Sequence, residues 1–208
     1  MEDADKRRPH KVEAQRTIFM FAHMMGAGWH ALDDGTARRE GSFYEWMTAS
    51  VFAAFSLEAY LNHLGPRRFK CWEKLERLPV QVKLSLILED LGQQPDFSCR
   101  PFRTVTEMLI FRNQMAHGRT KVVKETTIQE LSPGERPRYP EMPWESQCTQ
   151  EAARQFLDDA SAVIAQLHEW AGLDPFLLFS PETGSRTVAP VDEASRKAMR
   201  EKKRSSRK

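Results

Sequence analysis

Three side chains with different chemistry lie close together in "FRNQMAHGRT", residues 111–120. Arg112 carries a permanent charge, Asn113 an amide, and His117 an imidazole. An arginine can hold a phosphate through two hydrogen bonds, and a histidine can accept and donate protons. These groups suffice for metal-free cleavage of RNA, in which the ribose 2′-hydroxyl attacks the adjacent phosphate. DNA lacks that hydroxyl and would not react.

The segment that carries these groups has the spacing of an amphipathic helix. Apolar positions recur at intervals of three and four residues, and Arg112 falls on the same stripe, which comprises Val105, Met108, Leu109, Arg112, Met115 and Ala116. A guanidinium on an apolar stripe must be paired or face a groove, because burying it alone is costly. His117 lies in the last turn before Gly118, where the helix dipole favours the charged imidazole.

Arg112 and His117 cannot easily converge within one chain. They are five positions apart, which is roughly 140° around an ideal helix. Two copies of the helix, facing each other across a two-fold axis, would bring both groups to one shared cleft. The spacing therefore favours a homodimer.

Glu58 lies on a helix with few polar positions and needs a partner. We expect it to pair with Arg112 and to aim the guanidinium. A purely structural ion pair inside the bundle is an equally good interpretation.

At this point the residues resemble a known family. The sequence R-N-x-x-x-H-G at residues 112–118 is similar to the Rx4–6H motif of HEPN domains, and "SLEAYLNHL", residues 56–64, resembles the second-helix segment of many such proteins. The resemblance implies an all-α bundle that dimerises with both motifs at the interface. It implies a metal-independent RNase of a toxin–antitoxin, abortive-infection or other defence system, with Arg112 and His117 catalytic and Asn113 as their polar neighbour.

Two alternatives to a free nuclease remain open. One is a non-catalytic HEPN scaffold, in which the same cluster serves as an interface network or binding groove. The other is a toxin held silent by an antitoxin or a small nucleotidyltransferase. The cations Arg119, Lys121 and Lys124 follow the motif directly, and they could guide an RNA backbone or form a solvated edge.

The remaining pattern predicts an all-α, up-down bundle of about five helices. We expect helices over residues 11–33, 43–65, 77–92, 101–118 and 149–172, with Ser42 as an N-cap and Gly65 with Pro66 as stop signals. A long loop, 119–147, separates the fourth and fifth helices, and "TKVVKETTIQ" within it could form a short strand. The bundle domain would span residues 1–172, followed by a return segment and a basic disordered tail over 173–208.

Composition narrows the setting. The net charge is +2, but residues 186–208 hold nine Lys/Arg and three Asp/Glu, so the bulk of the chain is slightly acidic. The three cysteines are far apart in the sequence, which argues against a disulfide framework or a zinc knuckle. The apolar run at 17–32 is too short to cross a bilayer. We expect a cytoplasmic protein with no cofactor, no metal and no membrane contact.

Overall fold

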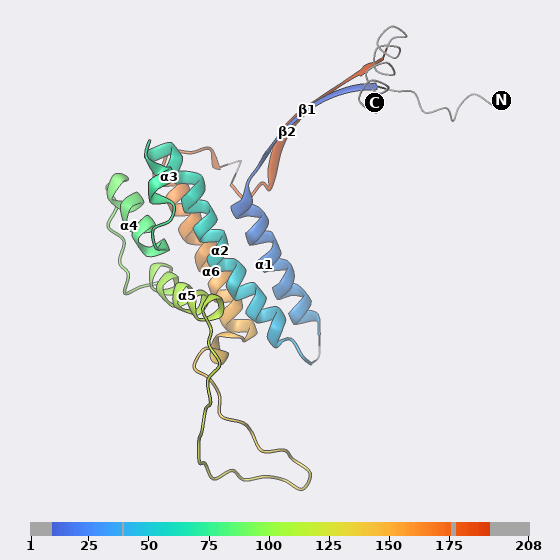
Figure 1. The fold of residues 1–208 in the computed structure, drawn as a ribbon, viewed down its shortest axis with the longest axis vertical. Coiled ribbons are helices and arrows are strands. Elements are labelled where there is room, and N and C mark those ends of the chain that lie inside the picture. The colour runs from blue at the N-terminus through green and yellow to red at the C-terminus, as the bar shows by residue number, and fades with distance from the viewer. Residues whose placement is uncertain (1–9, 39, 176–177, 192–208) are drawn as a thin grey trace, which may run out of the picture. The chain divides into compact units, whose positions relative to one another are not determined.

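The computed structural model describes residues 10–38, 40–175 and 178–191. The described part of the chain contains six α-helices, a 3-10 turn at Glu145–Gln147 and two strands (Figure 1). The helices are α1 (Met20–Ala37), α2 (Phe43–Arg68), α3 (Trp72–Leu75), α4 (Val80–Asp90), α5 (Phe102–Ala116) and α6 (Gln150–Trp170). The chain is therefore mostly helical, as predicted, with one small sheet that the all-α expectation did not contain.

The two strands form a unit of their own, distinct from the helical unit at residues 19–181. Strand β1 (His10–Ile18) pairs antiparallel with β2 (Glu182–Pro190), and His10 lies opposite Pro190. The prediction of a helix from residue 11 is wrong over this stretch, since α1 begins only at Met20. The return segment predicted after residue 172 contains β2. The predicted basic disordered tail lies mainly in residues 192–208, outside the described residues.

Helix α2 is the central element of the helical unit. It packs against α1, α4, α5 and α6, and its core side is fully buried at Leu57, Leu61 and Leu64. Helix α6 supplies the other large apolar stripe, formed by Ala153, Phe156, Leu157, Ala160, Val163, Ile164 and Leu167. Figure 1 shows α2 and α6 side by side, with α1 and α5 next to them. Helix α2 is thus the central buried helix of this unit.

Two predicted boundary signals of α2 have other roles. Ser42 precedes the helix, but its hydroxyl donates to the carbonyl of Gly35 at 2.7 Å instead of capping α2. The helix also continues past Gly65 and Pro66 to Arg68, so the predicted stop is wrong. The packing of Trp72 requires a glycine at position 65, because a Cβ there would lie 2.2 Å from the indole. Gly65 therefore permits close packing of the indole, and the helix ends three residues later.

The long connection between α5 and α6 is present as predicted. It runs from the end of α5 at Ala116 to Gln150, and most of it is exposed. Residues 120–129 are described and contain no strand, so that part of the prediction is wrong. The loop is folded back on itself, since the side chain of Gln129 bonds the backbone of Arg138 twice, at 2.8 and 3.1 Å.

None of the helices in the described ranges has both the length and the apolar character that a membrane span requires.

His63 on α2 provides a test of this packing. Its ring lies against Phe19, Phe21 and Tyr60, and burial, aided by the charges of Arg67 and His168, lowers the pKa of His63 to about 4. Between about pH 6.5 and pH 4 the unfolded chain binds a proton that the folded chain does not. The contribution of the uncharged His63 to the free energy of unfolding is therefore complete above pH 6.5 and is lost as the pH falls towards 4.

We predict that His63→Phe, which keeps a ring but cannot titrate, flattens this dependence. Wild type should lose on the order of 1 kcal/mol more than the variant between pH 7 and pH 5, since solvent screens part of the effect. Urea denaturation at both pH values measures the difference. His23→Phe, at an exposed position of α1, serves as the control. Parallel losses in wild type and His63→Phe would contradict the prediction.

Candidate functional site

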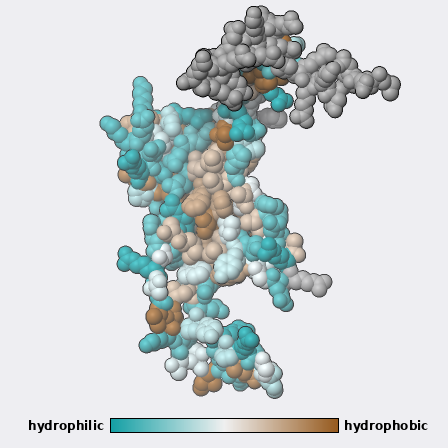
Figure 2. All heavy atoms as spheres, turned by 45° about the vertical axis from the view of Figure 1, so that its right-hand side comes forward, coloured by the Kyte–Doolittle hydropathy of each residue, from teal (hydrophilic) through white to brown (hydrophobic). Residues whose placement is uncertain are grey.

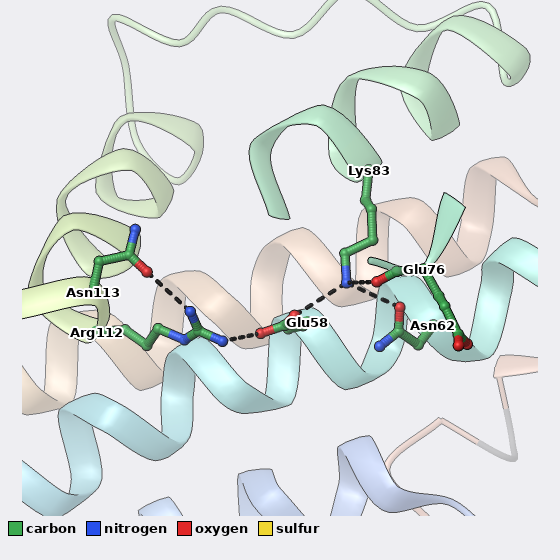
Figure 3. Close-up of polar contacts among 6 residues, drawn as sticks. All are labelled: Glu58, Asn62, Glu76, Lys83, Arg112 and Asn113. Carbon is green, nitrogen blue, oxygen red and sulfur yellow. Dashed lines mark hydrogen bonds and ion pairs between the residues drawn. The ribbon is translucent and has the colours of Figure 1, made fainter. Parts of the chain in front are cut away.

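Arg112 lies on the side of α5 that faces α2. Its side chain is 23% exposed, and its Nη2 donates to Oε2 of Glu58 at 2.7 Å (Figure 3). Nη1 donates to Oδ1 of Asn113 at 2.9 Å, and the guanidinium carbon lies 5.6 Å from the centre of the Phe55 ring. The predicted pairing of Glu58 with Arg112 is confirmed, and the Asn113 amide contributes to holding the same group.

Lys83 on α4 completes this cluster from the other side. Its side chain has no exposed surface, and its Nζ donates to Oε1 of Glu58 at 3.1 Å, to Oδ1 of Asn62 at 3.1 Å and to the carbonyl of Glu76 at 3.2 Å. All three ammonium protons are used, as a buried charge requires. Figure 3 shows Glu58 between the two cations, with one carboxylate oxygen turned to each.

This arrangement fixes Arg112 without neutralising the cluster. One carboxylate, Glu58, serves two cations, so the three groups carry a net charge of +1. A guanidinium has five N–H donors, and Glu58 and Asn113 take one each. Three donors remain, of which the Nε proton is buried and has no partner among the described residues. Arg112 is therefore oriented by its neighbours and keeps donors for an anionic group.

His117 lies at the other end of the motif in a different environment. It is the residue at which α5 ends, and its backbone N–H donates to the carbonyl of Asn113 at 3.0 Å. The imidazole is exposed, and among the described residues it makes no hydrogen bond or ion pair. An unrestrained imidazole at a helix end can exchange protons with a ligand, but nothing within the chain orients it.

The structure places Arg112 and His117 in two separate hollows. Arg112 and Asn113 line a groove of about 290 Å³ between α2, α4 and α5. His117 lines another, of about 480 Å³, formed with the start of the long loop and Trp144. One chain thus does not bring the pair to one point, in agreement with the expectation from helical spacing.

The predicted RNA-binding cations divide in the same way. Arg119 and Lys121 line the hollow of His117, whereas Lys124 is exposed on the long loop and lines neither hollow. Within the described residues, no three His, Cys, Asp or Glu side chains gather closely enough to hold a metal ion.

Sequence reasoning missed Lys83, although a signal for it existed. Lys83 falls on the apolar stripe of its helix, where its neighbours Val80, Leu84 and Ile87 are buried. A lysine at such a position needs an acceptor for the same reason that Arg112 needs one. Applied to α4, that argument would have assigned Glu58 two partners.

Compared with known proteins, the chain matches no family model, no curated protein and no solved structure. The HEPN-like assignment therefore stays a prediction from the two sequence segments that carry it.

We predict that Lys83→Met destabilises the helical unit. The variant keeps a long unbranched side chain but leaves acceptors on Glu58 and Asn62 without a donor, which should lower the free energy of unfolding by about 2 to 4 kcal/mol. Urea denaturation measures the loss. Lys74→Met, at an exposed position of α3, should change it by less than about 0.5 kcal/mol. Equal stability of Lys83→Met and wild type would show that the ammonium is dispensable for packing.

Proposed function

We propose that this chain is a metal-independent endoribonuclease of HEPN type that acts as a homodimer, in a toxin or defence role. The observation that supports this most directly is the state of Arg112. Glu58 and Asn113 hold its guanidinium in place at the edge of a groove, and two of its Nη donors have no partner among the described residues. A pre-oriented cation of this kind stabilises charge that develops on a phosphate.

The proposed reaction needs only the groups of the motif. The 2′-oxygen attacks phosphorus and forms the new P–O2′ bond while its proton passes to His117. The P–O5′ bond breaks, and the departing 5′-oxygen takes the proton that His117 accepted, so the products are a 2′,3′-cyclic phosphate and a 5′-hydroxyl. Arg112 stabilises the charge on the crowded phosphorane, and Asn113 and Glu58 keep the guanidinium oriented.

In this proposal, a second copy of the chain brings its His117 to the Arg112 groove of the first. The outer side of α2 carries Phe52 and Phe55, which are partly exposed and pack against each other with ring centres 6.0 Å apart. Figure 2 shows apolar residues gathered over the middle of one face of the helical bundle, with hydrophilic residues around them. A two-fold contact at this side of α2 would cover apolar surface beside the Arg112 groove and would border it with the second motif.

The alternative is a non-catalytic scaffold, in which the same dimer uses the cluster only as an interface network. The buried contacts of Lys83 and Glu58 favour this view, because they give the cluster a structural role without any substrate. If the nuclease is a toxin, an antitoxin or a small nucleotidyltransferase would hold it silent, and expression of the wild-type gene alone would slow growth.

We predict that the purified protein cleaves a labelled mixed-sequence RNA in EDTA and leaves 2′,3′-cyclic ends. His117→Ala should reduce the rate by about 10²- to 10⁴-fold and Arg112→Ala by about 10²- to 10³-fold, because the first removes the proton acceptor and the second the phosphate-stabilising cation. Initial rates from gel analysis give both values.

His30→Ala, at an exposed position of α1, is the matched control and should cleave like wild type. Equal cleavage by all variants would mean that another site or a contaminant is responsible. A folded dimer of wild type that leaves the RNA intact would favour the scaffold.

We also predict that Phe52→Glu converts the dimer to a monomer. A charge at this half-buried position is solvated in the monomer but would be buried without a partner in the dimer. Sedimentation velocity should show a shift to monomer mass, with cleavage reduced at least tenfold and helical content unchanged by circular dichroism. Tyr44→Glu, exposed near the start of α2, is the control. A Phe52→Glu variant that remains a dimer would place the interface elsewhere.

A further inference from the structure

The groove beside Arg112 is lined by a second arginine. Arg77, in the turn between α3 and α4, lines the same hollow of about 290 Å³ as Arg112 and Asn113. Its side chain is exposed and makes no ion pair or hydrogen bond within the described residues. Two guanidinium groups from distant parts of the sequence thus border one small groove.

The balance of charge around this groove is positive. Among the described residues, Glu58 is the only carboxylate that lines it, and this carboxylate is already shared between Lys83 and Arg112. The charged residues that line the groove, Arg77, Arg112 and Glu58, carry a net charge of +1, and the buried ammonium of Lys83 shares the same carboxylate. Such a groove attracts a compact anion and repels a cation.

The start of α4 adds to the same field. Val80 and Gln81 in the first turn of this helix also line the groove, and no side chain caps the helix. The first backbone bond there runs from the N–H of Lys83 to the carbonyl of Pro79, so the preceding N–H groups remain available to a ligand. The helix start supports the two arginines but would not define a site without them.

We propose that this groove binds a backbone phosphate of the RNA strand next to the scissile one, with Arg77 as its main contact. This inference rests on the proposed function and names a substrate contact in the Arg112 groove, which is separate from the hollow that His117 lines. A volume of about 290 Å³ is at the lower end of ligand sites and suits a phosphate with part of its nucleotide. Arg77 would bind substrate and transition state equally, so its loss would raise KM and leave kcat unchanged.

The test measures binding separately from cleavage. A mixed-sequence 2′-O-methyl RNA cannot react, and its affinity for wild type, Arg77→Ala and Arg103→Ala is measured by fluorescence anisotropy at several salt concentrations. Arg103 is an exposed arginine of α5 that pairs with Glu107 and does not line the groove. Arg103→Ala removes one positive charge, as Arg77→Ala does. Arg77→Ala should weaken binding about five- to tenfold and reduce the slope of log K against log salt by about 0.7, the value for one phosphate contact on a single strand. Arg103→Ala should change neither.

The outcomes separate the two proposals. If wild type binds RNA with a salt dependence that Arg77→Ala reduces, but does not cleave RNA, the phosphate-binding groove is supported and the nuclease function is contradicted. If RNA is cleaved and Arg77→Ala matches Arg103→Ala in affinity, salt dependence and KM, the phosphate-binding groove is contradicted and the nuclease function is supported. Binding of inorganic phosphate or AMP that is lost in Arg77→Ala, with no Arg77 effect on RNA, would assign the groove to a small free ligand and overturn the RNA contact.

Discussion

The buried ammonium of Lys83 is the constraint on which the rest of the site depends. A charge without access to water must keep all its hydrogen bonds, and Lys83 has its acceptors on α2 and at the turn before α4. Glu58 and Asn62 are four positions apart on α2, so both reach the same ammonium from one helix face. This requirement fixes the place of α4 against α2. It also turns one oxygen of Glu58 inward and leaves the other for Arg112.

Because one carboxylate meets both cations, core packing and the candidate site are mechanically linked. Leu57 and Leu61 bury the inner side of α2, while Glu58 and Phe55 on the same turns of the helix contact Arg112. A shift of α2 in the core would therefore move the guanidinium as well. A site built on helices in this way is more sharply positioned than one built on loops. The cost is that many changes near Glu58 would alter stability and function together.

The helical core could be predicted from the sequence because its signal is local. Periodic apolar residues predicted α2, α5 and α6 to within a few positions of their observed bounds. The pairing of Glu58 with Arg112 was predicted from the rule that a charge on the apolar side of a helix needs a partner. Strand β1 could not be found in this way, since its pairing partner lies more than 160 positions away and all its side chains are exposed. The groove at Arg77 also escaped, because three separate segments form it.

The two halves of the motif differ in how firmly the chain holds them, and this difference bears on how such a site would be controlled. Arg112 is fixed by Glu58 and Asn113, whereas His117 stands exposed where α5 ends. The proposed catalysis needs the guanidinium and the imidazole within hydrogen-bond reach of one substrate. Within one chain, only Arg112 of the two is held in place by neighbouring side chains. Under the proposed function, assembly of two copies would complete the site, and activity would rise with the square of protein concentration until the dimer saturates.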